Sequence, residues 1–141
     1  MSTPIFIDTG YILALLNTAD EHHSQARIAS QLVQPPFTIT EAVLTEIGNA
    51  LSRQRWRALG FATINDLRND PAITVLPVDT ALFERAFRLY GQRLDKEWGL
   101  TDCISFVVMQ ENGLAQVLTT DHHFTQAGFL NLLSNLPRAP K

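Results

Sequence analysis

Pro4-Ile5-Phe6-Ile7-Asp8 is the stretch that decides the fold, because it is an apolar run of strand length that stops abruptly at an aspartate. The same pattern returns at Val117-Leu118-Thr119-Thr120-Asp121. Residues 37–39 and 73–76 also read as short buried strands, and a last one is expected near residues 131–133. Strands that alternate with helical segments predict right-handed βαβ units. We therefore expect an α/β fold, a three-layer α/β/α sandwich with a central, mostly parallel sheet.

Helical periodicity fills the first two intervals between these strands. Thr18-Ala19-Asp20-Glu21 has the pattern of a capping box, which predicts a helix from there to about residue 33. A long helix is expected from Thr40 toward Gly60, with a shorter one over residues 61–68.

The second half of the chain repeats this alternation. Asp79 is expected to cap one helix. Thr101 is expected to cap the next, over residues 102–111, which is apolar on most sides and therefore central. No repeat and no linker rich in Gly, Pro or Ser interrupts the pattern, so we expect a single domain over residues 1–141.

Composition excludes several classes of protein. Apolar residues make up 45% of the chain and charged residues 18%, which is typical of a globular domain and not of a disordered one. The single Cys103 cannot form an internal disulfide or a thiolate metal cluster. The longest apolar run, residues 12–16, is too short to span a membrane. Because the first basic residue is Arg27, the start also lacks the charged flank of a signal peptide, and we expect a cytoplasmic protein.

The charge balance neither requires nor excludes a nucleic-acid partner. A net charge of -3 gives no bulk attraction to a polyanion, so binding would need a local basic patch. Nine of the eleven basic residues are arginine, whose planar guanidinium binds phosphate in a bidentate manner. Arginine also packs well on protein surfaces that bind no phosphate.

Four acidic residues are expected at one rim of the sheet. Asp8 and Asp121 follow predicted strands, and ligands bind at the carboxyl ends of parallel strands. Asp102 lies in the first turn of the most apolar helix, and Glu46 lies at the border of the buried face of the long helix. Singly, each has an ordinary structural explanation as a turn residue, a helix-dipole partner or a solvated side chain. Their shared location at one rim of the sheet favours a common functional site.

Clustered carboxylates require neutralisation, because like charges raise one another's pKa. The sequence places no lysine among these four, and Mg²⁺ or Mn²⁺ suits an all-oxygen ligand set. Such an ion lowers the pKa of a bound water and neutralises phosphoryl charge. The residues therefore indicate phosphodiester hydrolysis by a metal-activated water.

Four segments in this order resemble the PIN domain, the nuclease fold of many bacterial toxin–antitoxin ribonucleases of the VapC type. The resemblance runs from Phe6 to about Phe129. The segments are Phe6-Ile7-Asp8-Thr9, Thr40-Glu41-Ala42-Val43-Leu44-Thr45-Glu46-Ile47, Trp98-Gly99-Leu100-Thr101-Asp102-Cys103-Ile104-Ser105-Phe106 and Leu118-Thr119-Thr120-Asp121-His122-His123-Phe124.

The resemblance implies a metal-dependent endoribonuclease that is the toxin of a type II toxin–antitoxin pair. Asp8, Glu46, Asp102 and Asp121 would form the acidic site for Mg²⁺ or Mn²⁺, and the Thr9 hydroxyl is similar to the Ser/Thr of the family at that place. It also implies an RNA substrate, an antitoxin whose segment covers the acidic groove, and a homodimer.

The possible RNA contacts and the rival functions remain open at the level of sequence. Arg53 and Arg57 fall within about 20° of Glu46 if one helix carries all three, which would place two cations beside the acids. A PIN-type nuclease in RNA processing or DNA-end cleavage would carry the same acids without an antitoxin. A non-catalytic metal-binding or phospho-receiver-like α/β module is a further class, but neither Lys96 nor Lys141 follows a predicted strand, where a receiver needs a lysine.

Asp121-His122-His123 also resembles a motif of the DHH phosphoesterases. Those proteins are longer and use further acidic and histidine motifs that this sequence lacks. We interpret the segment as a turn that opens a short helix.

Overall fold

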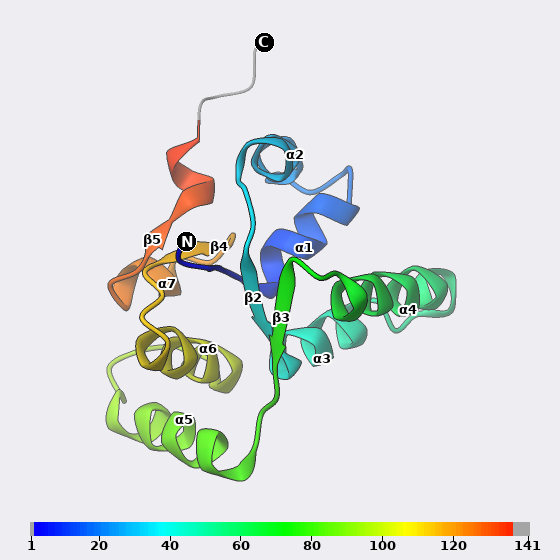
Figure 1. Ribbon diagram of the computed structural model, residues 1–141. Coiled ribbons are helices and arrows are strands. Elements are labelled where there is room, and N and C mark those ends of the chain that lie inside the picture. The colour runs from blue at the N-terminus through cyan, green and yellow to red at the C-terminus, as the bar shows by residue number, and fades with distance from the viewer. Residues whose placement is uncertain (1, 137–141) are drawn as a thin grey trace.

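A five-stranded sheet forms the centre of the molecule in the computed structural model, which describes residues 2–136 (Figure 1). The strands run in the order β3-β2-β1-β4-β5, and each neighbouring pair is parallel, which confirms the expected sheet. The strands are β1 (Ile5–Ile7), β2 (Phe37–Thr40), β3 (Ile73–Leu76), β4 (Gln116–Leu118) and β5 (Leu130–Asn131).

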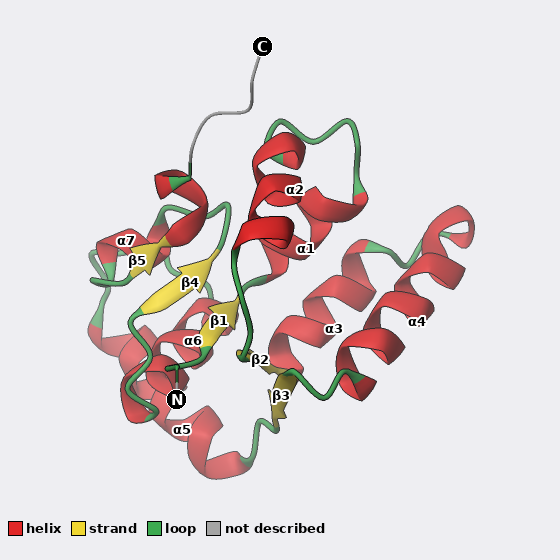
Figure 2. Ribbon diagram, turned by 45° about the horizontal axis from the view of Figure 1, so that its top comes forward, coloured by secondary structure: helices red, strands yellow, loops and turns green. Residues whose placement is uncertain are grey.

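Helices flank this sheet, as the alternating pattern predicts. α5 and α6 pack together on one side, while α1 and α2 pack together on the other (Figures 1 and 2). α3 and α4 lie side by side next to β2 and β3 and extend away from the sheet (Figure 1). The helices are α1 (Thr9–Leu16), α2 (His23–Leu32), α3 (Glu41–Ala50), α4 (Gln54–Asn69), α5 (Thr80–Gln92), α6 (Leu100–Glu111), α7 (His123–Gln126) and the 3₁₀ turn η1 (Leu132–Asn135). None of those in residues 2–136 has the length and apolar character that crossing a membrane demands.

An aromatic cluster fixes the starts of α6 and α7 relative to the sheet. The Phe106 ring meets the rings of Trp98 and Phe124 edge to face, with both centroid distances at 4.9 Å. Phe124 also packs on Phe6 of β1. Each edge-to-face pair adds roughly 0.5–1.5 kcal/mol to the free energy of burial. The cluster therefore holds the segments around residues 102 and 121 in a fixed position beside the end of β1.

The predicted long helix from Thr40 toward Gly60 is wrong, because the chain turns between Ala50 and Gln54. α3 begins as expected, with the Thr40 hydroxyl accepting a hydrogen bond from the Val43 N–H. α4 then folds back along α3 and continues to Asn69, so no separate helix covers residues 61–68. The return is close: a Cβ on buried Gly60 would lie 3.0 Å from the Leu51 Cβ.

The expected capping box at residues 18–21 is also wrong, and α1 was not predicted. Asp20 accepts a hydrogen bond from the His22 N–H at 2.8 Å and thus forms a turn, and α2 begins only at His23. α1 begins at Thr9 directly after a strand, with no side-chain cap to signal it. Asp8 is a residue type that favours the N-cap position, but its side chain accepts a hydrogen bond from the Thr119 hydroxyl instead of capping α1.

Of the two helix caps predicted in the second half of the chain, one is confirmed and the other is wrong. The Asp79 carboxylate accepts from the Leu82 N–H at 2.8 Å, which confirms the predicted cap of α5. Thr101 does not cap α6. Its N-cap residue is Gly99, whose N–H donates to the Asp102 carboxylate at 3.0 Å.

Candidate metal centre

β1 and β4 end side by side, and this sets the position of Asp8. Ile7 pairs with Leu118 in the parallel register, and the Asp8 N–H donates to the Leu118 carbonyl at 3.1 Å. The chain therefore leaves both strands at the same edge of the sheet. Asp8 is only 5% exposed there.

Thr119 joins the two strand ends through its side chain. Its buried hydroxyl donates to the Asp8 carboxylate at 2.7 Å and accepts from the Asp121 N–H at 2.9 Å. One hydroxyl thus positions a carboxylate from one strand and the backbone of another, although Asp8 and Thr119 lie 111 residues apart. The loop approaches α1 closely as well, since a Cβ on Gly10 would overlap the Thr120 hydroxyl.

α3 brings Glu46 to the same edge. The Thr9 hydroxyl, in the first turn of α1, donates to the Glu46 carboxylate at 2.6 Å. Because α3 starts where β2 ends, the Glu46 side chain lies near the carboxyl ends of the central strands. Thr9, the residue after Asp8, therefore orients the Glu46 carboxylate.

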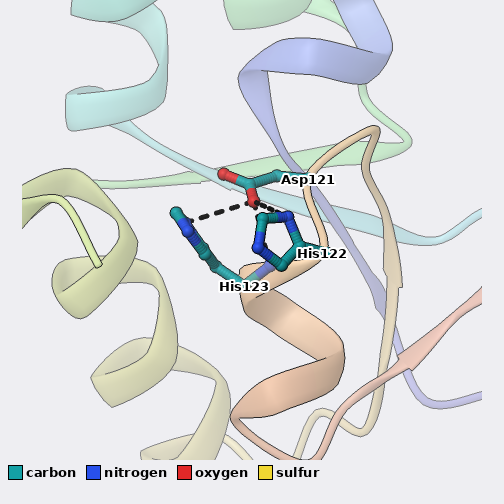
Figure 3. A group of neighbouring side chains, drawn as sticks. All are labelled: Asp121, His122 and His123. Carbon is teal, nitrogen blue, oxygen red and sulfur yellow. Dashed lines mark hydrogen bonds and ion pairs between the residues drawn. The ribbon is translucent and has the colours of Figure 1, made fainter. Parts of the chain in front are cut away.

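His123 connects Asp102 with Asp121. Its Nδ1 lies 3.0 Å from Oδ2 of Asp102 and 3.2 Å from Oδ1 of Asp121. The His123 backbone N–H donates to the same Asp121 oxygen at 2.9 Å, so Asp121 is held by the first residue of α7 (Figure 3). His122 also lies beside Asp121, but more loosely: its Nδ1 is 3.7 Å from Oδ1 of Asp121, and its side chain is 76% exposed (Figure 3).

The four acidic residues line one pocket of about 380 Å³, which we call the acidic pocket. Each acid comes from a different element: the end of β1, the middle of α3, the first turn of α6 and the loop after β4. Among the described residues that line it, none is lysine, arginine or histidine. The lining consists of Asp8, Thr9, Gly10, Leu13, Glu46, Gly99, Leu100, Thr101, Asp102, Thr120 and Asp121.

This surrounding disfavours ionisation of the buried acids. Burial raises the pKa of Asp8 to about 7, and the charges of Asp102 and Glu46 act in the same direction. The Thr119 hydroxyl bond opposes this shift only in part. Burial also raises the pKa of Asp102, against the hydrogen bonds from His123 and Gly99. Carboxylates that repel one another and lose water in this way are stabilised by a bound cation.

The hydrogen bonds leave ligand atoms available for such a cation. Among the described residues, a donor contacts Oδ2 of Asp102, Oδ1 of Asp121 and Oε1 of Glu46. The second oxygen of each of these carboxylates receives no hydrogen bond from residues 2–136. Hard divalent cations prefer oxygen ligands of this kind, so the residues fit Mg²⁺ or Mn²⁺.

Comparison with known proteins places this arrangement in a family. The family model described as PIN domain matches residues 5–130. The chain belongs to the PIN domain family. It is 27% identical over 128 residues to the 23S rRNA-specific endonuclease VapC20 from two strains of Mycobacterium tuberculosis, which covers 91% of this chain and 97% of the relative.

Solved structures agree with this assignment to the PIN domain family. The crystal structure of Mycobacterium tuberculosis VapC20, described as a sarcin-ricin loop cleaving toxin, matches with a TM-score of 0.83 and 28% identity over 89% of this chain and 96% of that chain. FitAcB from Neisseria gonorrhoeae matches with a TM-score of 0.65 and 18% identity over 94% of this chain and 99% of that chain, a likeness of fold.

Sequence reasoning missed two residues of this PIN domain site. The sequence prediction includes Thr119 in a strand, although a hydroxyl residue two positions before an acid at a strand end is a usable signal. Asp121-His122-His123 does open a short helix, as expected, but His123 also turns its imidazole toward two carboxylates. Ligand atoms of these three residues all lie within 4.8 Å of one another.

The predicted location of Arg53 and Arg57 is wrong. The prediction needs one continuous helix that carries both arginines beside Glu46, whereas the turn after α3 puts Arg53 at the N-cap of α4 and Arg57 within α4. Arg57 donates to the Ser52 carbonyl at 2.9 Å, and neither arginine lines the acidic pocket of this PIN domain. Contact of either side chain with RNA stays a prediction.

Proposed function

We propose that this PIN domain protein is a metal-dependent endoribonuclease and the toxin of a type II toxin–antitoxin pair, acting in the cytoplasm. It would hydrolyse RNA phosphodiester bonds with a water activated by Mg²⁺ or Mn²⁺. The observation that carries the proposal is the acidic pocket, where four carboxylates from four elements meet without a lysine or arginine. The similarity to VapC20, a 23S rRNA-specific endonuclease, supports RNA as the substrate.

The residues of the acidic pocket have separate tasks in this proposal. Asp8, Asp102 and Asp121 would hold the cation. When bound, a divalent cation neutralises charge on the phosphoryl group and lowers the pKa of a coordinated water. Glu46 would bind through water or orient the attacking water, and the Thr9 hydroxyl at 2.6 Å fixes the direction of its carboxylate.

Protein partners are the second part of the proposal: an antitoxin and a second copy of this chain. A groove of about 620 Å³, lined by α1, the end of α3 and the start of α4, shares Leu13 with the acidic pocket and therefore adjoins it. This supports an antitoxin that covers the site. Exposed Phe83, Phe87 and Tyr90 on one face of α5 support a further protein interface.

RNA binding is proposed to involve Arg53 and Arg57, both exposed near the start of α4. Removing a phosphate contact weakens binding at all sequences and reduces the salt dependence. Arg53→Ala and Arg57→Ala should therefore lower RNA affinity and flatten its salt slope. Arg68→Ala, an equally exposed arginine at the other end of α4, is the matched control.

Cleavage of a labelled structured RNA tests the activity. Wild-type protein should cut in millimolar Mg²⁺ or Mn²⁺ and stop in excess chelator, while Asp8→Asn should be inactive under all conditions. Asp66→Asn, an exposed acid on α4, is purified in the same way and should cut like wild type. Equal cleavage by Asp8→Asn and wild type would identify a contaminant and refute the proposal. A matched single-stranded DNA and a duplex DNA end show whether the substrate is RNA.

A further inference from the structure

His123 occupies an unusual place at the edge of the acidic pocket. Its Nδ1 hydrogen-bonds with Asp102 of α6 at 3.0 Å and forms an ion-pair contact of 3.2 Å with Asp121 of the loop after β4. These two carboxylates repel each other. Both neighbours are carboxylate oxygens, which accept hydrogen bonds when ionised, so Nδ1 carries the hydrogen. The side chain is only 17% exposed, and its position is therefore fixed by packing.

The contacts of His123 select one oxygen from each carboxylate. Nδ1 reaches Oδ2 of Asp102, which also accepts from the Gly99 N–H at 3.0 Å. On Asp121 it reaches Oδ1, which also accepts from the His123 backbone N–H. Among residues 2–136, Oδ1 of Asp102 and Oδ2 of Asp121 receive no hydrogen bond. The imidazole thus acts on the same oxygen of each acid as the backbone N–H groups do, and the opposite oxygens stay available for a ligand.

We propose that His123 is a positioning residue that sets the separation and rotation of Asp102 and Asp121 for a divalent cation, without being a ligand itself. The inference rests on the proposed metal-dependent function of the same pocket. Outer-shell partners that orient ligating carboxylates typically contribute 10–100-fold to metal affinity. His123 acts from α7, which the ring of its neighbour Phe124 anchors in the aromatic cluster.

Isosteric variants separate this role from simple filling of space. An asparagine side chain places its amide N–H where the Nδ1–H of histidine lies, whereas the amide of glutamine corresponds to Nε2. His123→Asn should therefore keep the contact to both carboxylates, while His123→Gln and His123→Ala should lose it. His122→Ala is the matched control, since that neighbouring imidazole is exposed and more distant from Asp121.

Calorimetric titration of the purified metal-free proteins with Mn²⁺ tests the inference directly, independently of any cleavage. We expect His123→Ala and His123→Gln to bind Mn²⁺ about 10–100-fold more weakly than wild type. His123→Asn should stay close to wild type and His122→Ala equal to it. Circular dichroism and melting curves show whether each variant folds. If His123→Ala does not fold, the comparison of the asparagine and glutamine variants decides.

Equal Mn²⁺ affinity in His123→Ala and wild type would overturn the inference, as would rescue by glutamine in place of asparagine. RNA cleavage at saturating Mn²⁺ provides a second readout. Activity of His123→Ala should then recover toward wild type, because excess cation compensates for weaker binding. Failure to recover would mean that His123 takes part in the chemistry itself, contrary to the inference. Absence of Mn²⁺ binding by wild type would instead refute the proposed function.

Discussion

Carboxylates in the acidic pocket and carboxylates along the α5 surface are held in opposite ways. At α5, Glu111 accepts two hydrogen bonds from the Arg85 guanidinium at 2.6 and 2.9 Å, and Asp95 accepts two from Arg93 at 3.0 and 3.1 Å. In the acidic pocket the donors are hydroxyls, backbone N–H groups and one imidazole. The chain therefore neutralises these two surface acids with arginine and leaves the pocket acids without a full counter-charge.

This difference appears in the pKa values. The Arg93 guanidinium holds the pKa of exposed Asp95 below its usual value, whereas burial raises the pKa of Asp8 to about 7. Ionisation of Asp8 thus opposes folding of the metal-free protein, while ionisation of a paired surface acid does not. The acidic pocket therefore carries an electrostatic cost that a bound cation would remove, whereas the arginine-paired surface acids carry none.

The largest effect is expected from pH. The folded-state pKa of Asp8, about 7, exceeds its ordinary value of 3.8, so the folded metal-free protein binds this proton more tightly than the unfolded chain. The contribution of Asp8 to the free energy of unfolding should therefore be greatest below about pH 4, fall as pH rises to about 7, and stay constant above it. The full change is about 4 kcal/mol, since each unit of pKa corresponds to roughly 1.4 kcal/mol.

Urea unfolding of wild type and Asp8→Asn in chelator, from about pH 4 to pH 8, measures this change. The asparagine variant lacks the titrating group, so its advantage in stability over wild type should grow with pH. A difference between the two proteins that is independent of pH would contradict the burial argument. Asp95→Asn, which removes a paired surface acid, should give no such rising advantage.

The second effect is stabilisation by metal. A ligand that binds only the folded state, present at a hundred times its Kd, adds about 2.7 kcal/mol to the free energy of unfolding. For a domain of this size that corresponds to a rise in Tm of roughly 8 °C. Mn²⁺ should raise the Tm of wild type by this order, and more at about pH 8 than at about pH 6, because protons compete with the cation for the carboxylates.

Scanning calorimetry with Mn²⁺, and with NaCl at matched ionic strength, separates binding from general screening. Asp8→Asn should show a much smaller rise in Tm, because it removes a charged ligand from the middle of the pocket. If Mn²⁺ left the Tm of wild type unchanged, the acidic pocket would not differ from the α5 surface in binding a cation, and the contrast would be refuted.

The central strands and the clustering of the acids could be predicted from sequence because both follow from local patterns. A short apolar run that ends at an aspartate indicates a buried strand and its end at once, as at Asp8. In a parallel sheet all such ends lie at one edge, so topology alone brings Asp8 and Asp121 together. Asp102 could be predicted at the same edge because it lies in the first turn of a buried helix.

The features that sequence reasoning missed depend on contacts between distant segments. The turn after Ala50 has no proline, and helical periodicity continues across it; folding back is favoured because α4 then packs on α3 and Gly60 meets Leu51. The orientation of His123 depends on the aromatic packing that places α7, which no local pattern reveals. Arg53 and Arg57 were misplaced for the first of these reasons.

A smaller effect is expected when one hydroxyl is removed from the pocket. Thr119→Val keeps the shape of the side chain but leaves the buried Asp8 carboxylate and the Asp121 N–H without their partner. The cost is about 2 kcal/mol of unfolding free energy, because buried polar groups lose both water and hydrogen bond. It should be largest above about pH 7, where Asp8 is ionised.

Chemical unfolding of Thr119→Val beside Thr119→Ser measures this cost. Serine retains the hydroxyl and should recover most of the loss. If valine is as stable as wild type while serine is destabilised, the stability comes from packing of the methyl group, and the hydroxyl does not hold Asp8.

The smallest effect is expected on the α5 surface, in spite of the short contact between Arg85 and Glu111. Both side chains are 44% exposed, so water solvates the two charges almost as well when they separate, and salt screens what attraction remains. Arg85→Ala should shift the Tm by less than about 2 °C, and this small shift should vanish in about 1 M NaCl. Calorimetry at low and high salt, beside Glu111→Gln, provides the measurement. A shift as large as that of Thr119→Val would mean that geometry outweighs exposure in this chain, and the contrast between buried and surface carboxylates would lose its physical basis.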